Sequence, residues 1–216
     1  LIADKHSHVN SNQQKLVDLY QSYMDESALN QLGAKPLQGL LTQVSQLQNK
    51  SQIASLMAKL AIDGVATPYE LAIHQDARDS SVMVADLAQS GLGLPDRDYY
   101  LKHDDKNMQH ALAEYRKYVA AMLSQLGDKN AALEATQIVA LETKLAQLQW
   151  TKVANRDPVK TYNKYPLAKL NQLAPNYAWN DYLAAANLHG KVTYLVISQP
   201  SFISGFNQLF LFIQSE

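Results

Sequence analysis

The sequence has no cysteine among its 216 residues. This absence excludes disulfide bonds, thiolate nucleophiles and zinc sites built on cysteine. It does not identify the cellular compartment, because proteins of oxidising compartments can also lack cysteine. A metal site in this chain would therefore need histidine and carboxylate ligands.

Net charge and long apolar segments are also scarce. The chain has 19 Lys+Arg and 20 Asp+Glu, for a formal net charge of −1, and no basic run with interleaved aromatic residues. We therefore expect no binding to nucleic acid or to an acidic membrane through bulk charge. The longest apolar runs, such as residues 209–213, are too short to span a bilayer. No signal peptide is visible at the N-terminus, although a mature or trimmed chain would look the same.

The remaining composition is that of a globular protein, with 47% hydrophobic and 18% charged residues. Apolar residues recur at helical spacing over most of the chain. The predicted helices are residues 16–24, a short helix before Gly33, 37–47, 53–61, 106–126, 131–150, 167–173, 179–186 and a last helix from Pro200. Ser11 or Asn12 is expected to cap the first helix, and residues 151–166 to form a long irregular connection.

A small β element interrupts the helical pattern. Residues 71–75 and 82–87 are short and partly β-branched, with a polar, turn-prone segment between them. They predict a β-hairpin, and residues 192–197 are a further candidate strand. No repeat period marks a solenoid. The expected fold class is therefore mainly α, one helical domain with a small β-hairpin.

Histidine is the first candidate for metal binding. The six histidines are His6, His8, His74, His103, His110 and His189. On a strand His6 and His8 would share a face, but no third ligand is close in sequence, so we favour a surface segment. His103 and His110 are too far apart along a helix to bind one ion.

Four aspartates cluster near the centre of the chain: Asp96, Asp98, Asp104 and Asp105. A calcium loop that starts at Asp96 would require glycine at its sixth position, where Leu101 stands. We therefore expect Asp96, Arg97 and Asp98 to hold a turn together through ion pairs and helix caps instead.

Other motifs give little support for catalysis. Gly91-x-Gly93 lacks the third glycine of a dinucleotide loop and is followed by Pro95, and no serine lies in a G-x-S-x-G signature. Glu142 lies in an apolar helix and could be a buried base. The alternative that we favour is that it faces solvent or pairs with a lysine such as Lys144.

Aromatic residues could line a peptide groove, but at helical spacing they are more often core or domain-interface residues, which we favour. The residues concerned are Tyr99, Tyr100, Tyr115, Tyr118, Trp150, Tyr162 and Tyr165.

Residues 90–101 read Ser-Gly-Leu-Gly-Leu-Pro-Asp-Arg-Asp-Tyr-Tyr-Leu. This stretch resembles a signature of the neprilysin and endothelin-converting enzyme family of zinc metallopeptidases. Further segments resemble the family in the family's order: residues 14–20, 65–69, 115–118, 141–146, 156–157, 161–164 and 199–202. The resemblance covers nearly the whole chain and looks closest to the bacterial secreted or lipoprotein members, which often lack the disulfides of animal members.

The resemblance implies two largely helical lobes around a large cavity, with zinc bound by an HExxH helix and a downstream E-x-x-x-D helix. Neither motif occurs in this chain, nor does the family's Asn-Ala-aromatic substrate motif. Residues 1–216 therefore resemble most of the lid-like lobe, an N-terminal non-catalytic region. We expect no catalytic or metal-binding residue here. Zinc, peptide substrates and the C-terminal catalytic region would be the cofactor and partners of the whole enzyme, in an extracytoplasmic compartment.

The signature itself is expected to be structural, a corner that holds the hairpin against the helices. Glycine permits positive φ, proline fixes the chain, and polar side chains can satisfy backbone groups of the turn. The residues of this structural signature are Gly91, Gly93, Pro95, Asp96, Arg97, Asp98 and Tyr99. No substrate-binding residue is assigned, because residues 6–12 stand where the family has a longer, substrate-contacting piece. Residues 206–213 also drift from the family's pattern.

A second interpretation is a stand-alone helical module that binds peptides or a partner protein without cutting. The two interpretations differ in whether the coding frame continues past Glu216 into an HExxH region. Residues 210–213 form an apolar helix end without an evident partner face, which favours the first interpretation.

Overall fold

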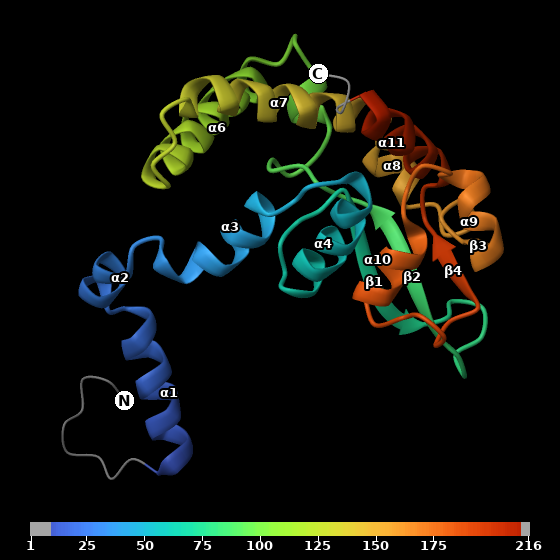
Figure 1. Cartoon of the computed structure of the whole chain (residues 1–216), viewed down its shortest axis with the longest axis horizontal. Coiled ribbons are helices and arrows are strands. Elements are labelled where there is room, and N and C mark those ends of the chain that lie inside the picture. Colours follow the sequence, from blue (N-terminus) through green and yellow to red (C-terminus); the bar gives the residue numbers. More distant parts are fainter. Residues whose placement is uncertain (1–9, 213–216) are drawn as a thin grey trace. The chain divides into compact units, whose positions relative to one another are not determined.

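The computed structural model describes residues 10–212 of the chain (Figure 1). The chain divides into two compact units, Leu1–Ser45 and Gln46–Glu216. Helices account for most of the described residues, so the expected mainly α class is confirmed. The assignment of residues 1–216 to one region of a larger peptidase stays a prediction.

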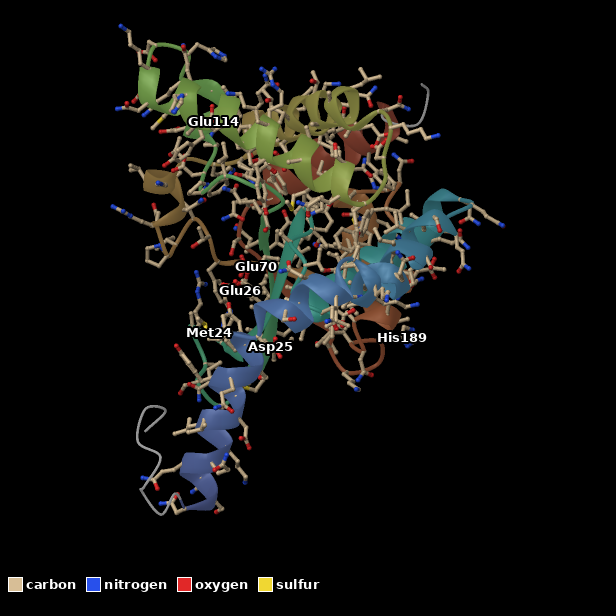
Figure 2. The ribbon with its side chains drawn as sticks, turned by 90° about the vertical axis from the view of Figure 1, so that its left-hand side faces the viewer. Met24, Asp25, Glu26, Glu70, Glu114 and His189 are labelled. Carbon is tan, nitrogen blue, oxygen red and sulfur yellow. The ribbon has the colours of Figure 1, made fainter. Side chains whose placement is uncertain are left out.

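The first unit consists of short helices: α1 (Ser11–Tyr23), α2 (Glu26–Leu32), the 3-10 helix η1 (Lys35–Leu37) and α3 (Gln38–Ser45). Asn10, rather than Ser11 or Asn12, caps α1. Its side chain accepts a hydrogen bond from the Gln13 N–H at 2.9 Å, and its own N–H donates to the Gln13 side chain at 2.9 Å. This reciprocal pair satisfies two backbone donors at the helix start. Met24 and Asp25 then separate α1 from α2 (Figure 2).

The predicted apolar stripe of α1 forms but is not buried. Leu16, Leu19 and Tyr23 are 61%, 67% and 80% exposed. None of the described residues in α1, α2, η1 or α3 is buried. Local capping therefore supports α1, through Asn10, and α2, where the Asp25 side chain accepts from the Ala28 N–H at 2.9 Å.

The second unit contains a sheet and its surrounding helices. Its strands are β1 (Tyr69–Gln75), β2 (Met83–Gln89), β3 (Asn163–Pro166) and β4 (Tyr194–Ile197). Its helices are α4 (Lys50–Ile62), α5 (Asp98–Leu101), α6 (Lys106–Gln125), α7 (Ala131–Leu148), α8 (Lys152–Asn155), α9 (Leu167–Leu173), α10 (Trp179–Ala185) and α11 (Pro200–Phe212).

The sheet has four strands in the order β1-β2-β4-β3. The predicted hairpin is confirmed as the antiparallel pair β1 and β2, and the candidate strand at 192–197 is confirmed as β4. β2 pairs with β4 in parallel, with Leu87 opposite Ile197, and β4 pairs with β3 antiparallel. The β element is therefore larger than the hairpin expected from the sequence.

The prediction of an irregular connection over residues 151–166 was wrong at both ends. α8 begins after Thr151, whose hydroxyl accepts a hydrogen bond from the Ala154 N–H at 3.2 Å. β3 pairs with β4, and Tyr165 lies opposite Leu195. Each of these elements has only four residues, so neither shows a periodicity that a sequence pattern could reveal.

The far end of the hairpin is held by Asp76, which is 5% exposed. Its carboxylate accepts hydrogen bonds from the Tyr162 hydroxyl at 2.8 and 2.9 Å, the Tyr194 hydroxyl at 3.1 Å and the Arg78 N–H at 2.8 Å. The bond from the Arg78 N–H is the main reason that the pKa of Asp76 lies below its ordinary value. One carboxylate therefore joins the end of β1 to β4 and the start of β3.

The core of the second unit is rich in aromatic side chains. Tyr69 is 1% exposed and lies 5.1 Å from Phe206, 5.2 Å from Tyr177 and 5.9 Å from Trp179 between ring centroids. Such edge-on and stacked pairs add to the stability that burial of the rings provides. Of the seven aromatic residues considered from the sequence, only Tyr100 is buried. Tyr165 is half-buried and packs against the core, as expected. Tyr99, Tyr115, Trp150 and Tyr162 are half-buried. Tyr118 is 60% exposed, so its expected place in the core was wrong.

The apolar end of α11 has a partner face, contrary to the expectation for residues 210–213. Phe210 is 6% exposed and lies 5.9 Å from Phe206 and 6.0 Å from Tyr177 between ring centroids. Leu211 is 43% exposed, as expected of a residue without a partner. Ile213 and the side chain of Phe212 lie outside the described part of the chain.

Candidate functional site

The signature stretch leaves β2 as a tight turn that only glycine permits at its first corner. Gly91 has φ of 89°, and a Cβ atom there would lie 2.9 Å from the Pro68 Cα. The Ser90 N–H donates to the Pro68 carbonyl at 2.9 Å. The chain before β1 therefore lies directly against the turn that follows β2.

The second glycine makes room for a hydrogen-bond network around Glu142. The Glu142 carboxylate accepts hydrogen bonds from the Tyr100 hydroxyl at 2.9 Å, the Tyr115 hydroxyl at 2.9 Å and the Gly93 N–H at 3.2 Å. A Cβ atom on Gly93 would overlap the Tyr115 hydroxyl. The favoured alternative, in which Glu142 faces solvent or pairs with Lys144, was therefore wrong.

The two tyrosines of this network are weaker acids than free tyrosine. Burial, and then the neighbouring Glu142 carboxylate, raise the pKa of Tyr115 well above its ordinary value. Burial is also the main cause of the raised pKa of Tyr100, whose hydroxyl accepts a hydrogen bond from the Leu94 N–H at 3.0 Å. Both hydroxyls therefore stay protonated and act as donors, which suits a positioning network better than proton transfer near neutral pH.

Asp96 and Asp98 both form ion pairs, and Asp96 also binds a backbone N–H of the turn. Asp96 forms an ion pair with Lys152 and accepts a hydrogen bond from the Asp98 N–H at 2.7 Å. Burial alone would raise the pKa of Asp96, but Lys152 and the Asp98 N–H lower it below the ordinary value. The Asp98 carboxylate lies 2.8 Å from the Lys102 ammonium.

Arg97 does not act as the sequence predicts. Its guanidinium forms no ion pair with any described carboxylate, and its Nε atom is buried without a hydrogen-bond partner among residues 10–212. It stands at the start of α5 but provides no side-chain cap. Pro95 is exposed and Tyr99 is half-buried.

Three glutamines, which sequence reasoning missed, fix β2 to the ends of α7 and α11. The Gln89 side chain accepts from the Trp150 N–H at 2.7 Å and donates to the Trp150 carbonyl at 3.1 Å, as a neighbouring strand would. Gln149 donates to the Ser90 carbonyl at 3.0 Å, and Gln199 accepts from the Gln89 N–H at 2.8 Å. The resemblance at residues 90–101 and at residues 199–202 gave the sequence signals near this cluster.

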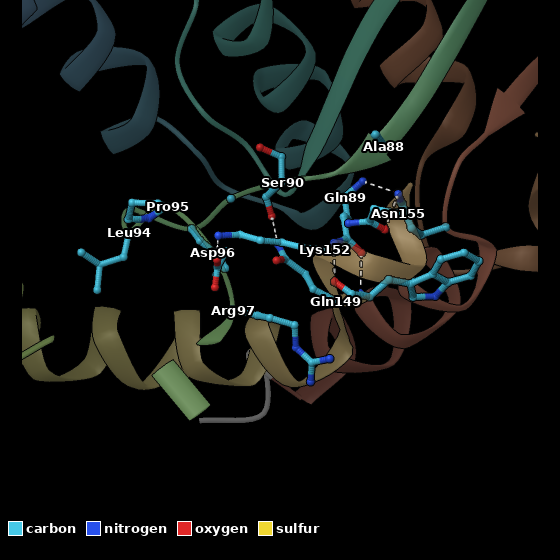
Figure 3. A pocket seen from close by; sticks show the side chains of 14 residues that line it. Ala88, Gln89, Ser90, Leu94, Pro95, Asp96, Arg97, Gln149, Lys152 and Asn155 are labelled. Carbon is cyan, nitrogen blue, oxygen red and sulfur yellow. Dashed lines mark hydrogen bonds and ion pairs between the residues drawn. The ribbon is translucent and has the colours of Figure 1, made fainter. Parts of the chain in front are cut away.

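A pocket of about 370 Å³ lies beside the turn (Figure 3). It is lined by residues 88–92 and 94–97 and by Gln149, Trp150, Lys152, Asn155 and Gln199. Its charged lining residues are Asp96, Arg97 and Lys152. The lining holds no histidine, and the arrangement suits recognition of a charged or polar group.

Histidine does not form a metal centre in the described part of the chain. No group of three or more His, Cys, Asp or Glu side chains there could hold a metal ion. His6 and His8 lie outside the described residues. His74 instead lies 3.6 Å from Asp86 through Nε2, and its Nδ1 lies 2.7 Å from the Gln75 carbonyl oxygen. Among residues 10–212, no helix is both long and apolar enough to cross a membrane.

The sequence model of Peptidase family M13 matches residues 1–214. Among curated proteins, endothelin-converting enzyme 1 of Cavia porcellus is 28% identical over 191 residues, which are 85% of this chain and 25% of that protein. The Homo sapiens protein of the same name is 28% identical over 192 residues, with the same shares covered.

Solved structures show the same similarity. Mycobacterium tuberculosis zinc metalloprotease ZMP1 in complex with an inhibitor superposes with a TM-score of 0.85 at 30% identity, over 97% of this chain and 32% of that one. Its open state gives a TM-score of 0.83 at 30% identity. The chain thus spans about a quarter of the curated relatives and a third of the solved structures that it matches.

Proposed function

Because the chain belongs to Peptidase family M13, we propose that it is the N-terminal, non-catalytic region of a zinc metalloendopeptidase that hydrolyses peptides. The observation that carries the proposal is the match over residues 1–214 to proteins three to four times as long. HExxH and E-x-x-x-D motifs, which would supply zinc ligands, are absent from the sequence. The zinc ion and the reacting peptide bond would therefore contact residues outside this chain.

In this proposal, the zinc ion would polarise the scissile carbonyl and activate water. Residues 10–212 offer no cluster of side chains that would fit a zinc site. This chain would form a wall of the enzyme's internal cavity, and that wall would admit only peptides as substrates. An extracytoplasmic location completes the proposal and rests on the family resemblance alone.

The signature residues take a structural part in the same proposal. Two contacts support it: the Gly93 N–H with Glu142, and Asp96 with Lys152. The first joins the turn to α7 and the second joins it to α8, so the turn holds the hairpin against helices that lie much later in the chain.

Two proteins expressed from the same gene test the proposal: the 216-residue chain and the product of the longest reading frame that contains it. Zinc content and cleavage of an internally quenched peptide would be measured for each. We expect zinc at one per molecule and chelator-sensitive cleavage for the longer protein, and neither for the 216-residue chain.

A reading frame that stops at Glu216 would reject the proposal and favour the stand-alone binding module. Tight, stoichiometric zinc on the 216-residue chain would reject the placement of the ligands outside it.

A further inference from the structure

Two of the three charged side chains in the signature turn form ion pairs within the described residues, and the third does not. Asp96 is paired with Lys152, and Asp98 with Lys102. Arg97 stands between the two aspartates but has no ion pair within the described residues. Figure 3 shows its guanidinium turned away from the Asp96 side chain. The turn therefore holds one cation that forms no ion pair with a carboxylate of residues 10–212.

Arg97 also has an unsatisfied donor. Its Nε atom is buried and has no hydrogen-bond partner in the part of the chain described. A buried N–H of a charged group that stays without an acceptor is destabilising, and native structures rarely leave one so. The planar guanidinium fork matches a carboxylate, which can accept from two of its N–H groups together.

The surroundings of Arg97 have the size and rigidity of a binding site. The pocket that it lines has a volume of about 370 Å³, which is within the usual range for small-ligand pockets. Lys152 adds a second cation to the lining, against the single carboxylate of Asp96. The side chains of Gln89 and Gln149 are held by hydrogen bonds to the backbone, so this part of the lining is fixed before any ligand arrives.

We infer that this pocket is a carboxylate-binding site in which Arg97 is the principal donor and Lys152 supplies supporting charge. The ligand class is an acidic residue of a polypeptide segment. That segment is either a free peptide or a part of the same protein that follows these 216 residues. The carboxylate-binding role of Arg97 does not depend on the proposed function. Only the second source of the ligand, a later part of the same protein, rests on that proposed function.

The test uses the 216-residue chain and two blocked single residues as probes, N-acetyl-glutamate methylamide and its neutral glutamine counterpart. Heteronuclear NMR would follow the Arg97 Nε–H signal during titration. We expect a saturable downfield shift with the glutamate probe, with a dissociation constant in about the millimolar range, and none with the glutamine probe. In variants that lack Arg97, binding would be followed through the backbone N–H signals of residues 88–92, which line the pocket. Arg97→Gln should weaken binding at least about tenfold, as the loss of a charge-assisted bidentate pair requires.

Two further variants keep the result interpretable. Arg116→Gln removes an equal charge from an exposed position on α6 and should leave binding unchanged. Arg97→Lys keeps the charge but lacks the fork, and should bind more weakly than the original chain. The inference would be overturned if the glutamate probe did not shift the Nε–H signal. It would also be overturned if Arg97→Gln and Arg116→Gln changed the dissociation constant equally.

The longer protein distinguishes the two sources. If its own acidic segment fills the pocket, the Arg97 Nε–H signal will already be downfield and the glutamate probe will not shift it. If the ligand is a free peptide, the longer protein will respond to the probe as the 216-residue chain does. If the longer protein binds the probe normally but cleaves no peptide, that result would count against the proposed function alone.

Discussion

The Tyr100 hydroxyl and the Glu142 carboxylate lie 2.9 Å apart and join the short helix α5 to the middle of α7. The same hydroxyl accepts from the Leu94 N–H at 3.0 Å, so one side chain serves both the turn and the helix. This arrangement makes the turn a part of the core packing, although its glycines and proline are typical of a surface loop.

Replacement of Tyr100 by phenylalanine should destabilise the chain. The change removes a donor to Glu142 and an acceptor for Leu94, and leaves both groups without that partner. We expect the free energy of unfolding to fall by about 1–3 kcal/mol in urea denaturation. Tyr118→Phe is the control, because Tyr118 is 60% exposed and surface changes are usually within about 0.5 kcal/mol. Equal stability of the two variants would show that the network contributes nothing.

Replacement of Gly93 by alanine should also destabilise the chain, for a steric reason. The new Cβ atom would overlap the Tyr115 hydroxyl, so the ring must move and lose its bond to Glu142. We expect a loss of about 1–3 kcal/mol in the same denaturation experiment. Gly39→Ala is the matched control, since nothing lies within 4 Å of its Cβ position in α3. It should instead raise stability by up to about 1 kcal/mol.

Long amphipathic helices could be predicted from the sequence because their signal is local. Apolar residues at helical spacing indicated α6 and α7, and Gly127 marked the break between them with φ of 89°. β3 could not be predicted, because four residues become a strand only through pairing with β4, some thirty residues later in the chain. The same limit applies to the cap of α1. The sequence predicted Ser11 or Asn12, but Asn10 is the cap because it forms a reciprocal pair of hydrogen bonds with Gln13.

The candidate site was less predictable than the fold. Gly93, Tyr100 and Glu142 were each noticed in the sequence, but 42 residues separate Tyr100 from Glu142, and 49 separate Gly93 from it. Only the packing of α5 and α6 on α7 brings them together. A carboxylate inside an apolar stripe was the one sign of such a network, and it fits a solvent-facing residue equally well.

Two buried tyrosine hydroxyls predict a contrasting result. Tyr69 and Tyr182 are 1% and 0% exposed, and neither hydroxyl has a hydrogen-bond partner in the described residues. Since a buried hydroxyl without a partner is unfavourable, Tyr182→Phe should leave the free energy of unfolding unchanged or raise it by up to about 1 kcal/mol. Differential scanning calorimetry of Tyr182→Phe beside Tyr100→Phe should show a loss of stability in Tyr100→Phe alone. A clear loss of stability in Tyr182→Phe would indicate that its hydroxyl has an acceptor after all.

Asp86 predicts a specific dependence of stability on pH. Burial raises its pKa, although the Ser198 hydroxyl at 3.0 Å and His74 at 3.6 Å oppose that shift, while Glu70 adds to it. Because the folded state holds this proton more tightly than the unfolded chain, Asp86 lowers stability as pH rises from about 4 through the folded pKa. Asp86→Asn should remove that part of the decline, so its stability relative to the original chain should increase from pH 4 to pH 7.

The partner of Asp86 gives the opposite variant. Ser198→Ala removes the hydroxyl that stabilises the charged carboxylate, so the pKa of Asp86 should rise further and the decline with pH should become steeper. Urea denaturation of both variants at several pH values between about 4 and 7 measures the slopes directly. Parallel pH profiles for the original chain and Asp86→Asn would show that another group causes the dependence. His74 is the group to replace next, because its Nε2 faces the same carboxylate.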